Sequence, residues 1–207
     1  MAEFSFRAPR QLGLRLWHWL NFLTFAGLLV TVLLRDELVS VREHRDLIQQ
    51  KLASLGVTVT PDQAKAVARM YLERLWDWHV DLGLVLAFLL AVRVVVALTT
   101  PAGAGLLAKL QAGRRAAATD AGARKFTAVK ASHVAFYAGL SLIVGTGVAL
   151  AYGKSWGLSD GVRHQIGDVH EICMYGLLAF IAAHIGGVIW AEKTSDPGLV
   201  SDMINGG

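Results

Sequence analysis

Four long apolar runs restrict the folds that this chain of 207 residues can adopt. They cover about residues 16–34, 80–98, 134–152 and 172–190. Each is about twenty residues long, the length of helix that crosses a hydrocarbon core of about 30 Å. The whole sequence is 54% hydrophobic and 17% charged, more apolar than most soluble domains. The pattern predicts an all-α integral membrane protein, a four-helix bundle embedded in the lipid bilayer.

The net charge of +4 is unevenly distributed along the chain. The segment between the second and third runs carries one acid, Asp120, against six basic residues: Lys109, Arg114, Arg115, Arg124, Lys125 and Lys130. An excess of Lys and Arg marks the cytoplasmic side of a membrane protein. This segment and both termini are therefore predicted to be cytoplasmic. Because membrane topology explains this excess of basic residues, we do not expect binding to nucleic acid.

The chain is expected to form one domain, residues 1–207, with an insertion over residues 35–78. ELVSVREHRDLIQQKLASLG has apolar residues at helical spacing, and Gly56 is a plausible helix stop. In the following segment Thr60, Pro61 and Gln63 are typical of a helix start. An outer, periplasmic helical hairpin is therefore predicted between the first and second spans, acting either as a spacer or as a lid or docking platform.

The basic, Gly- and Ala-rich stretch TTPAGAGLLAKLQAGRRAAATDAGARKF is predicted to be a flexible cytoplasmic connector. The tail EKTSDPGLVSDMINGG is short and polar, with a small apolar patch. The lone Cys173 excludes an internal disulfide, and no C-x-x-C-H motif is present for covalent haem attachment.

Histidines are the chemically informative residues of the apolar runs. His44 and His164 fall outside the runs and are expected to be solvated. Five others lie on or at the ends of the runs: His18, His79, His133, His170 and His184. Ionisable residues in membrane spans are costly and usually face the interior of the bundle. Five such residues therefore indicate a functional site.

The depths of these histidines suggest two tiers. His170 and His184 are separated by fourteen residues, which is about 21 Å of helix rise and about 40° short of four full turns. They therefore face nearly the same way, one near each surface. Because alternate spans run in opposite directions, His18 falls at the inner depth and His79 at the outer depth. Topology thus predicts the pairs His18/His184 and His79/His170.

Two imidazoles from facing helices suit haem iron better than other metals. Zinc usually takes about four protein ligands, whereas haem supplies four nitrogens and needs two axial ligands. Helix-bundle cores commonly hold such cofactors. Arg15, Arg93 and Arg163 are candidates to pair with haem propionates, although basic residues that snorkel to the surface would look the same.

The alternative function that these histidines suggest for the protein is proton or metal transport. A transport path needs ionisable groups through the membrane, and none lies between the two tiers. His133 is left over, at the inner start of the third run, and its role stays open.

Three of the runs carry a family resemblance. LGLRLWHWLNFLTFAGLLV, KASHVAFYAGLSLIVGTGVAL and VHEICMYGLLAFIAAHIGGVIW resemble the first, third and fourth helices of the prokaryotic cytochrome b561 family. That superfamily includes the di-haem b-type subunits of nickel-iron hydrogenases and the gamma subunits of formate dehydrogenases. The paired histidines of the last segment are its most specific feature.

The resemblance implies two b haems in the bacterial inner membrane, held by the same four histidines. It also implies electron transfer between membrane quinone and an acceptor or partner on the outer side. The long insertion departs from the smallest members of the family, and it favours a periplasmic redox protein or enzyme subunit as the partner. The chain would then be the electron-transfer subunit of an oxidoreductase. The alternative is an autonomous oxidoreductase of a small molecule such as superoxide.

Overall fold

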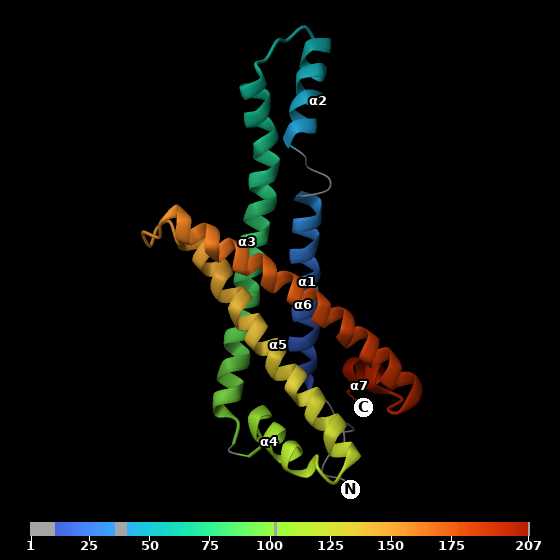
Figure 1. Cartoon of the computed structure of the whole chain (residues 1–207). Coiled ribbons are helices and arrows are strands. Elements are labelled where there is room, and N and C mark those ends of the chain that lie inside the picture. The colour runs from blue at the N-terminus through green and yellow to red at the C-terminus, as the bar shows by residue number, and fades with distance from the viewer. Residues whose placement is uncertain (1–10, 36–40, 102, 207) are drawn as a thin grey trace. The chain divides into compact units, whose positions relative to one another are not determined.

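The computed structural model describes residues 11–35, 41–101 and 103–206, and these residues form helices without any strand. The helices, shown in Figure 1, are α1 (Leu12–Leu33), α2 (Val41–Ser54), α3 (Pro61–Thr99), α4 (Leu106–Ala116), α5 (Ala121–Tyr152), α6 (Asp160–Thr194) and α7 (Leu199–Asn205). Four of them, α1, α3, α5 and α6, are long and apolar enough to cross a membrane. The predicted all-α class and the four spans are therefore confirmed.

The chain divides into two compact units, which are described separately. The larger unit comprises residues 1–19 and 87–207, and the smaller unit comprises residues 20–86. Helices α1 and α3 each contribute residues to both units, whereas α5 and α6 belong entirely to the larger one.

Helices α5 and α6 pack against each other in the larger unit (Figure 1). Leu140 of α5 is fully buried, and Leu177 of α6 is nearly so. A Cβ atom at Gly139 would lie 3.3 Å from Cδ2 of Leu177, so the glycine permits close approach of the two helices. Both helices begin at a side-chain cap: Asp120 accepts from the amides of Gly122 and Ala123, and Ser159 accepts from the amide of Val162.

The predicted flexible connector is wrong, because residues 106–116 form helix α4 and α5 already begins at Ala121. Leu106, Leu110 and Gly113 recur at helical spacing and are at least partly buried. Gly113 lies against α5, where an added Cβ would approach Thr127 Oγ1 to 2.6 Å. The abundant glycine and alanine therefore allow close packing of α4 on α5 rather than a loose linker.

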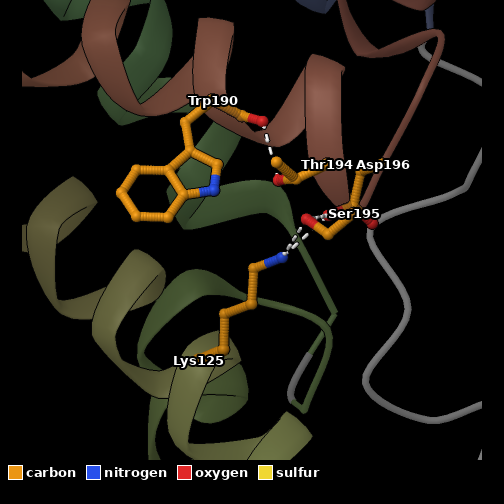
Figure 2. Close-up of polar contacts among 5 residues, drawn as sticks. All are labelled: Lys125, Trp190, Thr194, Ser195 and Asp196. Atoms are coloured by element: carbon orange, nitrogen blue, oxygen red, sulfur yellow. Dashed lines mark hydrogen bonds and ion pairs between the residues drawn. The ribbon is translucent and has the colours of Figure 1, made fainter.

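The predicted polar tail also folds, as the short helix α7. The Glu192 carboxylate accepts hydrogen bonds from the amides of Gly198 and Val200, at 2.8 and 3.0 Å. Figure 2 shows a second anchor, in which Lys125 Nζ of α5 lies 2.7 Å from Asp196 Oδ2 and 2.8 Å from Ser195 Oγ. These contacts fix the end of α6 to the beginning of α5.

In the smaller unit, α2 and the first part of α3 run in opposite directions (Figure 1). Helix α2 ends where the amides of Gly56 and Val57 bond to the carbonyls of Ala53 and Leu52, with Gly56 at a φ of 75°. This is a Schellman ending, and its left-handed position favours glycine. Residues 36–40, the start of the predicted insertion, lie outside the described residues.

Helix α3 starts at the predicted capping box. The amide of Thr60 donates to Gln63 Oε1 at 2.9 Å, and the amide of Gln63 donates to Thr60 Oγ1 at 3.2 Å. The helix then continues for 39 residues, a length of about 58 Å. That is nearly twice the thickness of a hydrocarbon core, so α3 joins a polar segment directly to its apolar span.

Candidate functional site

His18 and His184 lie next to each other in the larger unit. His18 belongs to α1, and His184 to the last third of α6. Their ring centroids are 6.4 Å apart, with a tilt of 59° between the ring planes. Two helices that are far apart in sequence thus present a pair of imidazoles to the same small region.

The spacing of this pair fits one metal atom bound from both sides. A metal–nitrogen bond is about 2 Å long, and the ring centre lies about 1 Å beyond the nitrogen, so two such ligands place their ring centres about 6 Å apart. Among the described residues, no group of three or more His, Cys, Asp or Glu could hold a metal ion. The pair therefore suits haem iron, which needs only two protein ligands.

Aromatic rings surround the inner pair. Phe180 stacks parallel to His184 with centroids 6.1 Å apart, and Phe136 of α5 lies 5.1 Å from Phe180. Trp19 meets His18 edge-on at 5.3 Å. The Nδ1 atom of His18 is buried and has no hydrogen-bond partner among the described residues. Ring packing therefore contributes to the orientation of both imidazoles.

His170 lies on α6 and contacts α5 in a different way. Its Nδ1 atom is 2.9 Å from Thr146 Oγ1. The next residue, Gly147, makes room for the ring, because a Cβ atom there would lie 3.1 Å from Cε1 of His170. Thr146 and Gly147, which are adjacent on α5, thus form the surface against which this imidazole packs.

His79 lies in the smaller unit and has a similar partner. Its Nδ1 atom is 2.8 Å from Thr31 Oγ1 of α1. Trp76 stacks on the imidazole with centroids 5.0 Å apart and planes 6° from parallel, and Arg35 covers Trp76 at 5.0 Å. The pairing of His79 with His170 stays a prediction, since the two residues belong to different units.

The sequence matches the family described as prokaryotic cytochrome b561 over residues 10–206. The chain belongs to that family. No curated protein and no solved structure matches it significantly. The family places the chain among membrane proteins that bind haem b and transfer electrons. The imidazole pair at 6.4 Å is the feature of this cytochrome that best fits that cofactor.

The three arginines predicted near haem propionates have different surroundings in the cytochrome. Arg15 donates through Nη2 to the carbonyl of Ile204 on α7, and Arg163 reaches Asp160 Oδ1 at 3.4 Å. The Nε atoms of both are buried and have no hydrogen-bond partner among the described residues. Such donors fit an acidic group, so both residues remain candidates to bind a propionate.

Arg93 makes the most extensive contacts of the three arginines. Its Nε donates to the hydroxyl of Tyr137 at 2.8 Å, and its guanidinium lies over the rings of Trp17 and Tyr137 at 5.9 and 5.6 Å. Trp17 in turn donates through Nε1 to the carbonyl of Leu89 at 2.8 Å. Arg93 of α3 thereby contacts both α1 and α5.

Sequence reasoning missed the residues that hold the outer histidines. Thr31 and Thr146 contact His79 and His170, and Trp76 stacks on His79. A threonine inside an apolar span, at the depth of a histidine on another span, is the signal that could have suggested these contacts. His133, whose role the sequence leaves open, is half-buried on α5, one turn before Tyr137.

Proposed function

We propose that the chain is a di-haem b-type membrane cytochrome that transfers electrons between the membrane quinone pool and a redox partner in the periplasm. The His18/His184 pair is the observation that carries this proposal, because the spacing of its two rings suits haem iron and no cluster of three or more metal ligands occurs among the described residues. In this assignment His18 and His184 would hold the inner haem through its iron.

A second haem would be held by His79 and His170 at the outer side. The support for this pair is their common depth in the spans and the similarity of their surroundings. Each has its Nδ1 atom next to a threonine hydroxyl of another helix. Because Nδ1 faces the threonine in each case, Nε2 would be the iron-binding atom of each imidazole.

The protein residues keep the inner site dry and the ligands in place. Phe136, Phe180 and Trp19 surround the imidazoles, and Arg15, Arg93 and Arg163 supply donors for acidic groups. Bound haem supplies a one-electron couple in each tier, whose potential depends on ligation, burial and nearby charge. The chain contributes binding, orientation and electrostatics, and no covalent chemistry of its own.

The distribution of basic residues supports an orientation of the chain in the membrane. The basic segment over residues 99–133 favours a cytoplasmic location for that loop and for both termini in the bacterial inner membrane. Helix α2 and the first part of α3 then lie in the periplasm, where they would form the docking platform for a redox protein or enzyme subunit. Quinone would reach the haems from the lipid.

A haem count and a reduced-minus-oxidised spectrum of the purified chain test the proposal. We expect two b haems per chain and a single haem in His184→Ala, because that substitution removes one ligand of the inner pair only. His164→Ala is the matched control, since His164 is exposed on the same helix and should leave both haems in place. A folded but colourless protein would contradict the proposal and favour a transporter.

A further inference from the structure

Two threonines contact histidine side chains in the apolar part of the chain. Thr31 Oγ1 lies 2.8 Å from His79 Nδ1, and Thr146 Oγ1 lies 2.9 Å from His170 Nδ1. In each case the threonine and the histidine are on different helices, α1 with α3 and α5 with α6. The same side-chain pair therefore occurs independently in the smaller unit and in the larger unit.

The direction of each hydrogen bond follows from the single hydroxyl proton. Thr31 Oγ1 donates to the carbonyl of Leu28 at 2.6 Å, and Thr146 Oγ1 donates to the carbonyls of Leu142 and Ile143 at 2.8 and 3.0 Å. Because a hydroxyl has one proton, its oxygen can only accept from the imidazole. We therefore assign the proton of each imidazole to Nδ1 and its lone pair to Nε2.

His18 has no equivalent contact at its Nδ1 atom, which is buried and has no hydrogen-bond partner among the described residues. His184 contacts the rings of His18 and Phe180. His79 and His170 thus have an acceptor at Nδ1, whereas His18 has none among these residues.

We propose that Thr31 and Thr146 are positioning residues that hold His79 and His170 in the iron-binding tautomer and lower the reduction potential of the outer haem. This inference rests on the proposed function. An acceptor at Nδ1–H increases the electron density at Nε2, and a more basic ligand stabilises ferric over ferrous iron. His18 lacks such an acceptor among the described residues, so the two haems would differ through their ligand surroundings.

Potentiometric titration of the full-length protein with Thr31→Val or Thr146→Val tests this inference. Valine keeps the shape of threonine but cannot accept a hydrogen bond. We expect each variant to shift the ferric-to-ferrous ratio of one haem about three- to tenfold toward ferrous, the effect of losing one hydrogen bond. A tenfold shift is about 59 mV for a one-electron couple. The electron paramagnetic resonance signal of the same ferric haem should change with it.

Matched controls separate this effect from general damage to the helix. Thr24 is buried on α1 and donates to the carbonyl of Leu20 at 2.8 Å, but no histidine contact accompanies that bond. Thr24→Val should therefore leave both potentials unchanged, and Thr31→Ser should restore the wild-type potential. Loss of one haem in a valine variant, with both haems retained in the serine variant, would also support the positioning role.

Three results would overturn the inference. The first is that both reduction potentials keep their wild-type values in the valine variants. The second is that the potentials of both haems shift together, and the third is that Thr24→Val has the same effect as Thr31→Val. Failure of the proposed function would look different, because the wild-type protein itself would then contain fewer than two haems.

Discussion

At the scale of single residues, the four histidines proposed to bind haem have different contacts. The imidazoles of His18 and His184 contact Trp19 and Phe180, and such stacking and edge contacts each contribute about 1 kcal/mol. The imidazoles of His79 and His170 form directional hydrogen bonds with threonine. A hydrogen bond fixes both the rotation and the tautomer of an imidazole, whereas a ring contact fixes only its plane.

Gly147 gives a residue-scale prediction about His170. A methyl group at this position would lie 3.1 Å from His170 Cε1, which is closer than carbon atoms normally approach. Gly147→Ala should therefore displace the imidazole and weaken its bond to Thr146. We expect loss or broadening of one of the two haem signals in the reduced-minus-oxidised spectrum.

Gly145 of the same helix provides the control for this substitution. No atom lies within 4 Å of a Cβ built there, so Gly145→Ala should leave the spectrum unchanged. If Gly147→Ala also had a wild-type spectrum, the close packing of His170 against Gly147 would not be required for cofactor binding.

At the scale of helices, the sequence predicts elements best where one strong local rule applies. The four spans follow from hydropathy, and the start of α3 follows from the Thr60–Gln63 capping box. Helix α4 was missed because Gly113 resembles a loop signal, although it packs against Thr127. The bonds from Thr31 and Thr146 could not be predicted, because they depend on the rotation of one helix against another.

The cap of α5 gives a prediction at this scale. Asp120 accepts from the amides of Gly122 and Ala123 at 2.7 and 3.4 Å, and so satisfies two donors at the start of the helix. Asp120→Ala should lower stability by about 1 kcal/mol, measured as an earlier thermal unfolding of the detergent-solubilised protein. Asp120→Asn should remain close to wild type, because asparagine caps a helix equally well. Equal loss in both variants would instead indicate a role for the charge.

At the scale of the whole molecule, membrane topology decides which side each functional part can serve. Basic residues lie in α4 and in the first turns of α5, and the turn between α2 and α3 lies at the opposite end of α3. Because α3 is one continuous helix through its apolar span, these two regions must face opposite sides of the membrane. A periplasmic redox partner is possible only if the α2–α3 turn is the outer one.

Labelling of single cysteines in intact cells tests this orientation. Cys173 is the only native cysteine, so Cys173→Ser gives a background without thiols. In that background Val57→Cys places a thiol in the exposed α2–α3 turn, and Ala104→Cys places one in the exposed loop before α4. A membrane-impermeant maleimide applied from the periplasmic side should label the first variant and reach the second only after the inner membrane is permeabilised. The reverse pattern would put the hairpin in the cytoplasm, exclude a periplasmic partner at α2, and exchange the inner and outer assignments of both histidine pairs.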